Sequence, residues 1–160
     1  MSYRIGLGYD VHRLAEGETL WIGGFLIPHE KGLVAHSDGD VLLHAICDAL
    51  LGAAKLRDIG YHFPDTSAEF KCIDSKVLLA ETYRMVLKKG FRLVNLDATI
   101  SAQRPRLKEY IPGMESSISD VLKVDVDAVN IKATTTEKLG FEGREEGISV
   151  QAVVLIEKIG

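Results

Sequence analysis

The sequence predicts a single α/β domain, spanning residues 1–160, in which one mixed β-sheet is covered by helices on one face. Three observations support this fold class. Several stretches alternate apolar with polar or small residues, which is the period of a β-strand. Helical patterns lie between these stretches, so helices should pack on the sheet. The chain has 160 residues, 46% of them hydrophobic and 26% charged, as is typical of one globular domain.

The first strand is expected in YRIGLGYDVH, residues 3–12. Its apolar side chains fall on one face, while Asp10 and His12 fall on the other together with two glycines. We expect helices to cover the apolar face, which leaves Asp10 and His12 on a partly polar face that meets water or another subunit. Glycine on that face would allow close approach to the backbone. The segment is not a dinucleotide fingerprint, because Val11 occupies a glycine position of that motif.

The remaining strands and turns follow in order along the chain. A short hairpin is expected at residues 20–28, turning at Gly23-Gly24. The same alternation of apolar and polar residues then predicts strands at 94–101, 129–135 and 148–156.

Three helices are expected between these strands. The first, residues 38–55, is apolar throughout its later part except for His44, Asp48 and Gly52, so most of its faces should be buried. The second, residues 74–89, begins at Asp74 and stops at Gly90, which suits both ends of a helix. The third carries apolar residues at helical spacing from Ile111 to Leu122.

Charge, cysteine content and hydropathy narrow the class of protein. The net charge of −4 and a pI near 5.7 argue against a nucleic-acid-coating surface but leave room for a small phosphorylated ligand. No apolar run approaches the length of a membrane span, and the start MSYRIGLGYD has no targeting composition. Cys47 and Cys72 lack CxxC spacing and are expected to be reduced thiols. We therefore expect a cytoplasmic protein without membrane contact.

Asp10, His12 and His44 are a candidate metal site. A strand that places aspartate and histidine on one face, with a histidine on a helix, offers three ligands suited to zinc and leaves a fourth position open. The alternative is a solvated strand face for Asp10 and His12. His44 would then be a core histidine hydrogen-bonded to Asp40 or Asp48, each one helical turn away.

Other polar segments also have two interpretations. In HSDGD, Ser37 and Asp40 form a capping-box pattern, although Asp38 is an equal candidate for the cap. In KATTTEKLGFEGREEG, residues 132–147, hydroxyls and Glu137 can hold phosphate and magnesium, or form a plain charged turn. LRDIGYHFPDTS, residues 56–67, is either a flap over a ligand or a surface loop. The three cations of AQRPRLK, residues 102–108, contact phosphate or only solvent.

The combination of these motifs resembles one family. H-S-D-G-D-x-x-x-H-A followed by D-A-L-L-G-A, the upstream G-x-D-x-H, the D-I-G…F-P-D-T loop and K-A-T-T-T-E-K-L-G-F closely resemble the 2-C-methyl-D-erythritol 2,4-cyclodiphosphate synthases of the non-mevalonate route to isoprenoids. The resemblance spans nearly the whole chain, from Arg4 to about Ile156.

The resemblance implies a metal-dependent phosphorus–oxygen lyase. The 2-phosphate of 4-diphosphocytidyl-2-C-methyl-D-erythritol 2-phosphate attacks the β-phosphorus, CMP leaves and a cyclic diphosphate forms. The family is a homotrimer in which the other face of each sheet packs around a central three-fold axis, with active sites between subunits. An isoprenoid diphosphate in the central channel, with Arg144 as its candidate contact, is a further partner to be tested. The cofactors would be zinc on Asp10, His12 and His44, and magnesium or manganese on Glu137.

The resemblance also implies individual roles. His36 and Thr135 would stabilise the transition state. The residues implied in substrate binding are Asp10, Val11, His12, His36, Ser37, Asp58, Ile59, Gly60, Phe63, Pro64, Asp65, Thr66, Ser67, Ala102, Gln103, Arg104, Pro105, Arg106, Leu107, Lys108, Thr134, Thr135, Thr136, Glu137, Phe141 and Arg144.

Two departures from the family pattern concern substrate contacts. Arg106 stands where lysine is expected after the proline, and Ser67 replaces a frequent aspartate. His29 and His62 are given no role.

Two other functions are also compatible with these residues. A zinc-dependent phosphohydrolase would use the open zinc position to activate water. A trimeric protein that binds an isoprenoid or nucleotide diphosphate without turnover is the other.

Overall fold

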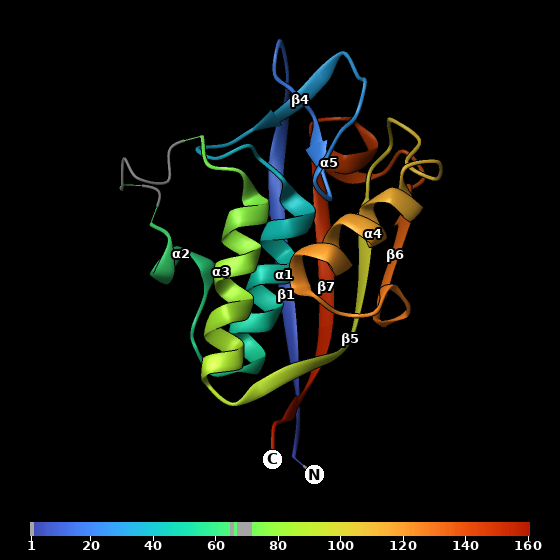
Figure 1. Cartoon of the computed structure of the whole chain (residues 1–160). Coiled ribbons are helices and arrows are strands. Elements are labelled where there is room, and N and C mark those ends of the chain that lie inside the picture. Colours follow the sequence, from blue (N-terminus) through green and yellow to red (C-terminus); the bar gives the residue numbers. More distant parts are fainter. Residues whose placement is uncertain (1, 65, 67–71) are drawn as a thin grey trace.

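The chain forms one five-stranded sheet, seen in a computed structural model that describes residues 2–64, 66 and 72–160 (Figure 1). The strand order is β4-β1-β7-β5-β6. β5 and β6 are parallel and the other neighbouring pairs are antiparallel, which confirms the predicted mixed sheet. The strands span Tyr3–Glu16 (β1), Lys31–Val34 (β4), Phe91–Ser101 (β5), Val129–Thr134 (β6) and Gly147–Lys158 (β7).

The predicted hairpin is a separate two-stranded sheet of β2 (Trp21–Ile22) and β3 (Phe25–Leu26). Its turn residues Gly23 and Gly24 have φ angles of +64° and +78°, the left-handed region that glycine adopts without steric cost. The turn is therefore where the sequence predicts it.

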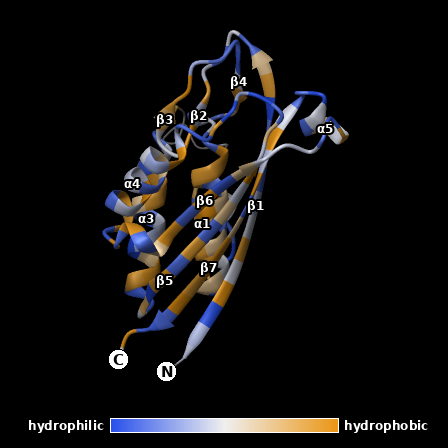
Figure 2. Cartoon of the chain, turned by 90° about the vertical axis from the view of Figure 1, so that its right-hand side faces the viewer, coloured by the Kyte–Doolittle hydropathy of each residue, from blue (hydrophilic) through white to orange (hydrophobic). Residues whose placement is uncertain are grey.

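All three predicted long helices are present: α1 (Val41–Ala53), α3 (Ser75–Lys88) and α4 (Ile111–Leu122). They lie on one side of the five-stranded sheet (Figure 2). The shorter helices are α2 (Ile59–His62), the 3₁₀ turn Val126–Ala128 and α5 (Gly140–Gly143). None of the described helices is long and apolar enough to cross a membrane.

One expectation about β1 is wrong: the helices cover its glycine face, not its apolar face. A Cβ built on Gly6 would lie 1.9 Å from the carbonyl oxygen of Ala49 on α1, so α1 packs directly on that side of the strand. The apolar side chains of the other face are exposed, with Ile5 at 73% and Leu7 at 65%. Helix packing needs small residues where two backbones meet, and this requirement outweighs hydrophobicity along β1.

The packing of α1 on the glycine face of β1 also determines what the polar residues of this strand face. Asp10 and His12 share the face of Gly6 and Gly8, because side chains alternate along a strand. They therefore face α1 and its histidine. Val11 points to the exposed face and is 42% exposed.

Candidate active site

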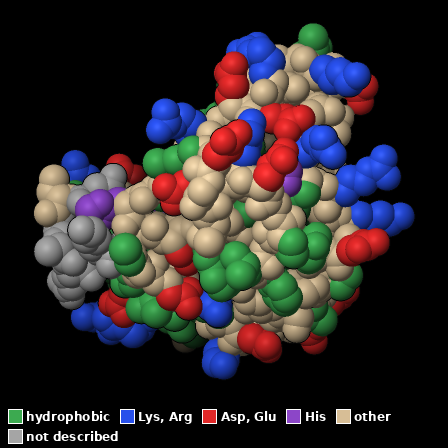
Figure 3. Space-filling view, turned by 90° about the horizontal axis from the view of Figure 1, so that it is seen from above, with side chains coloured by type: hydrophobic (Ala, Val, Ile, Leu, Met, Phe, Trp, Pro, Cys, Tyr) green, Lys and Arg blue, Asp and Glu red, His purple; other side chains and the backbone are tan. Residues whose placement is uncertain are grey.

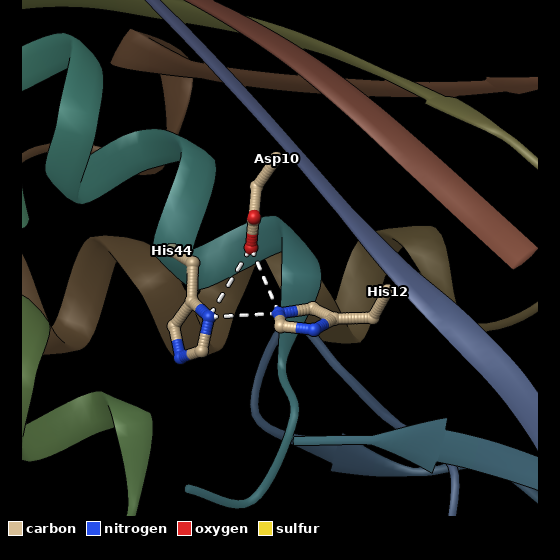
Figure 4. A group of neighbouring side chains, drawn as sticks. All are labelled: Asp10, His12 and His44. Atoms are coloured by element: carbon tan, nitrogen blue, oxygen red, sulfur yellow. Dashed lines mark hydrogen bonds and ion pairs between the residues drawn. The ribbon is translucent and has the colours of Figure 1, made fainter. Parts of the chain in front are cut away.

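Asp10, His12 and His44 meet where the middle of β1 lies beside the first turn of α1 (Figure 4). Asp10 Oδ2 lies 2.9 Å from His12 Nε2 and 3.2 Å from His44 Nδ1. The two ring nitrogens are 3.1 Å apart. Three potential ligand atoms therefore converge on one point, two from neighbouring positions of β1 and one from α1, more than thirty residues later.

The spacing of these atoms fits a metal ion. Tetrahedral zinc with ligands at about 2.0–2.2 Å holds neighbouring ligand atoms about 3.4 Å apart. The three atoms form a nearly equilateral triangle slightly smaller than this, so a small outward shift would accommodate the ion. Two imidazoles and one carboxylate form a donor set that suits zinc and related transition metals.

The electrostatics of the site favour a negative Asp10 next to histidines. Burial alone would raise the pKa of Asp10, but the hydrogen bonds from His12 and His44 outweigh it and lower the pKa to about 2. Burial lowers the pKa of His44, yet the hydrogen bond and charge of Asp10 raise it above its usual value. The negative charge of Asp10, which stabilises a protonated histidine beside it, would also attract a metal cation.

The second ring nitrogen of His44 faces two serines, not the carboxylates considered from the sequence. His44 Nε2 lies 2.9 Å from Ser75 Oγ at the start of α3 and 3.1 Å from Ser37 Oγ. Neither the Asp40 carboxylate nor the Asp48 carboxylate hydrogen-bonds the His44 ring, because both accept from backbone N–H groups instead.

Asp40 holds the first turn of α1 in place. Its carboxylate, fully buried, accepts hydrogen bonds from the backbone N–H groups of Leu43, Gly23 and Gly24. Asp40 is thus the N-cap of α1 and also anchors the β2–β3 turn. The sequence offered Ser37, in a capping box with Asp40, or Asp38 as the cap; both expectations are wrong, because Asp40 itself is the N-cap. Asp40 lies one helical turn before His44, so the cap helps to position that side chain.

A cleft of about 370 Å³ opens beside the three candidate ligands. His36 and Ser37 line it from the loop before α1, and Ile59, Gly60 and Phe63 line it from the predicted flap. The flap is tied to α1, because Asp48 Oδ1 accepts a hydrogen bond from Ile59 N at 3.0 Å. Asp58 is the N-cap of α2 and accepts from Tyr61 N.

A second group of predicted residues lies apart from this cleft. Residues 102, 103 and 105–108 line a separate pocket with Thr134 and Thr135, and Arg104 lines an adjoining one that also contains Thr135. Glu137 is exposed, 3.3 Å from Thr135 Oγ1. Figure 3 looks onto the end of the molecule near β4 and α5 and shows Lys and Arg side chains along its rim.

Within one described chain the two groups share no lining residue. Phe141 and Arg144 belong to neither pocket: Phe141 packs near Gly147, and Arg144 pairs with Glu146 at 2.9 Å. Pro64 and Thr66 are exposed flap residues. The predicted contacts of Asp65 and Ser67 lie outside the described residues.

Two residues near the site had no functional signal in the sequence. Ser75 follows the N-cap Asp74, and its position in the sequence indicates only the first residue of a helix. The sequence indicates Asp38 only as a candidate helix cap. In the structure its carboxylate accepts hydrogen bonds from the backbone N–H and the hydroxyl of Ser75. Only the packing of α3 against the loop before α1 brings these residues behind His44.

Comparison with known proteins identifies relatives over the full chain. The 2-C-methyl-D-erythritol 2,4-cyclodiphosphate synthase of Phocaeicola vulgatus is 62% identical over 158 residues, covering 99% of each chain. The bifunctional IspDF from Campylobacter jejuni is 46% identical with a TM-score of 0.95, over 99% of this chain and 43% of that longer one.

A solved structure of 2C-methyl-D-erythritol-2,4-cyclodiphosphate synthase in a CDP-bound form is 38% identical, with a TM-score of 0.89 over 96% of this chain and 100% of that one. The family model matches residues 3–157. The agreement of sequence, fold and candidate site over nearly every residue shows that the chain belongs to the YgbB family.

Proposed function

We propose that the chain converts 4-diphosphocytidyl-2-C-methyl-D-erythritol 2-phosphate to 2-C-methyl-D-erythritol 2,4-cyclodiphosphate and CMP, the product named in its relatives. The observation that carries the proposal is the convergence of Asp10, His12 and His44 beside a cleft that His36 and the flap also line. The reaction class is that of a phosphorus–oxygen lyase.

The chemistry requires positioning and charge stabilisation, since the attacking phosphate is already an anion. No side-chain nucleophile is therefore needed. His36, exposed in the cleft, and Thr135, at the end of β6, are the proposed transition-state-stabilising residues. Ser37 lies beside His44 and can donate a hydrogen bond to a phosphate oxygen. Ile59, Gly60 and Phe63 would enclose the methylerythritol part and exclude water.

Two metal ions fit the side chains present. A zinc ion held by Asp10, His12 and His44 would polarise a phosphate oxygen on the attacking side. Glu137 is a single exposed carboxylate beside Thr135. Magnesium or manganese is commonly held by one or two carboxylates together with substrate phosphates. An ion held by Glu137 would therefore neutralise the diphosphate of the substrate and stabilise the departing CMP.

The two separate pockets are best explained by an assembly in which neighbouring subunits complete one site. The cleft provides the metal, His36 and the flap, whereas residues 102–108 with Thr134 to Glu137 would provide the cytidine and diphosphate contacts. We assign this assembly as a homotrimer, packed through the exposed sheet face that carries Tyr3, Ile5, Leu7, Tyr9, Val11 and Val153. Such an apolar surface typically marks an interface.

We also propose a cytoplasmic location, which the two cysteines support. Cys47 and Cys72 are both free thiols, and free thiols persist in a reducing compartment. A cytoplasmic location fits this state.

Phosphorus NMR of the purified protein with the diphosphocytidyl substrate, zinc and magnesium tests the proposal. Two coupled signals of a cyclic diphosphate, with free CMP, are expected. An acyclic phosphate with CMP would instead identify a phosphohydrolase. Unchanged substrate with metal bound would identify a diphosphate-binding protein without turnover.

A further inference from the structure

We infer that Ser75 and Asp38 form a hydrogen-bond relay that sets the tautomer of His44 and makes Nδ1 its metal-binding atom. The two residues act as positioning residues, because neither touches the cleft's ligand atoms directly. This inference rests on the metal site of the proposed function and extends it to residues behind that site.

The direction of each hydrogen bond follows from what Asp38 can do. A carboxylate only accepts hydrogen bonds. Asp38 Oδ1 lies 2.5 Å from Ser75 Oγ, so Ser75 donates its hydroxyl proton to Asp38. Ser75 has a single hydroxyl proton, and its oxygen therefore presents a lone pair to His44 Nε2, 2.9 Å away.

His44 must then carry a proton on Nε2. Where the ring is doubly protonated, its second proton lies on Nδ1 and is donated to Asp10, and that is the proton which a metal ion replaces. A neutral imidazole with hydrogen on Nε2 has its lone pair on Nδ1. That nitrogen is the one that faces Asp10 Oδ2 and His12 Nε2. The relay therefore prepares the lone pair at the point where the three candidate ligands meet, which is the usual effect of a hydrogen bond to the far nitrogen of a metal-binding histidine.

The relay is rigidly held. Asp38 Oδ2 accepts from the backbone N–H of Ser75 at 2.8 Å, and Oδ1 accepts from the N–H of Asp40 at 3.1 Å. Ser75 is fully buried at the first residue of α3. Neither group can turn away without losing buried hydrogen bonds, so the direction of donation is fixed by the fold.

Ser37 is a weaker second partner for the same nitrogen. Its hydroxyl lies 3.1 Å from His44 Nε2 and 3.3 Å from the N–H of Gly39. Ser37 also lines the cleft, where a ligand competes for its hydroxyl. Ser75 has no such competitor among the described residues, so it is the partner that holds the tautomer throughout binding.

Two substitutions test the relay in the full-length protein. Asp38→Asn keeps the shape but introduces an amide that can donate to Ser75, which would reverse the relay and favour hydrogen on Nδ1. Ser75→Ala removes the relay and leaves only Ser37. The matched control is Ser119→Ala, which deletes another buried serine whose hydroxyl donates to the Ser116 carbonyl on α4.

Zinc affinity is measured by competition with a chromophoric chelator. Both relay variants are expected to bind zinc about 10- to 100-fold more weakly than wild type, with Ser119→Ala unchanged. Nitrogen-15 NMR of metal-free protein at alkaline pH then reports the tautomer of His44. Hydrogen on Nε2 is expected in wild type and a shift towards Nδ1 in Asp38→Asn.

The outcomes distinguish a failure of the relay from a failure of the proposed metal site. If wild type binds zinc and both relay variants bind it equally well, the relay is overturned while the metal site stands. If wild type fails to compete with the chelator, the metal site of the proposed function is overturned. The tautomer measurement needs no metal and still tests the relay by itself: wild type with hydrogen on Nδ1 contradicts it.

Discussion

Gly8 on β1 lies directly against the main-chain carbonyl of Ala45 on α1. A Cβ built on Gly8 would stand 1.9 Å from that oxygen and 2.7 Å from the backbone nitrogen of Ala49. Ala45 follows His44 in the sequence, so this contact sets how closely His44 approaches Asp10 on the same strand. The glycine therefore helps to set the geometry of the candidate metal site.

We expect Gly8→Ala to displace α1 and to weaken both folding and metal binding. The added methyl group meets backbone atoms, which cannot rotate away, so the free energy of unfolding should fall by about 3 kcal/mol or more. Chemical denaturation measures this loss. The matched control is Gly52→Ala on the same helix, where a Cβ meets nothing within 4 Å; it should stabilise by about 0.5–1 kcal/mol. Equal effects at the two glycines would refute the role given to Gly8.

His44→Ala should remove the bound zinc and abolish turnover while the fold survives. The ring is one of three ligands, and its removal leaves only Asp10 and His12. Metal analysis after dialysis, together with circular dichroism, measures both effects. His62→Ala is the control for zinc content, because His62 is not one of the three candidate ligands and its Nε2 lies 2.7 Å from the Leu56 carbonyl oxygen. Full zinc content in His44→Ala would show that the ligand set is wrong.

Leu7→Lys should dissociate the proposed trimer into monomers. Leu7 is 65% exposed on the bare sheet face, and a lysine buried there in an assembly would place an unpaired charge in an apolar interface. Analytical ultracentrifugation measures the mass. Val77→Lys on α3, at a site that is 55% exposed on the helical side, should leave the mass unchanged. A trimeric Leu7→Lys variant would place the interface elsewhere.

Asp48 should make stability depend on pH in the acidic range. Burial raises its pKa above 3.8, opposed by the hydrogen bond from Ile59 N and reinforced by the charges of Asp58 and Asp10. The folded state then binds the proton more tightly than the unfolded state, so this group lowers the unfolding free energy as pH rises through its pKa.

Asp48→Asn keeps an acceptor for Ile59 N and removes this titration. Relative to wild type, the variant should therefore gain stability as pH increases from about 4 to neutral. Urea denaturation at a series of pH values measures the difference. A constant difference across this range would mean that burial does not perturb Asp48.

The three long helices, the hairpin and four strands of the main sheet depend on local patterns and could be predicted from the sequence, whereas the short edge strand β4 was not predicted. The Gly23-Gly24 turn, the cap at Asp74 and the stop at Gly90 depend on the backbone preferences of single residues. Local patterns could not predict which face of β1 packs against α1. That choice depends on the contact of Gly6 and Gly8 with small residues of a helix more than thirty positions later. Hydrophobicity alone pointed to the opposite face.

By itself, the sequence determined the mixed α/β layer, the candidate ligands Asp10, His12 and His44, and the resemblance to a single family, because these depend on local period and residue type. Tertiary structure alone decided that Ser75 and Asp38 lie behind His44. It also decided that the Asp40 carboxylate accepts hydrogen bonds from both the β2–β3 turn and the first turn of α1. Finally, it separated the predicted substrate contacts into two pockets. The physical reason is that hydrogen-bond partners and pocket walls come from segments far apart in the chain, and only the packing of α1 and α3 on the sheet sets the distances between them.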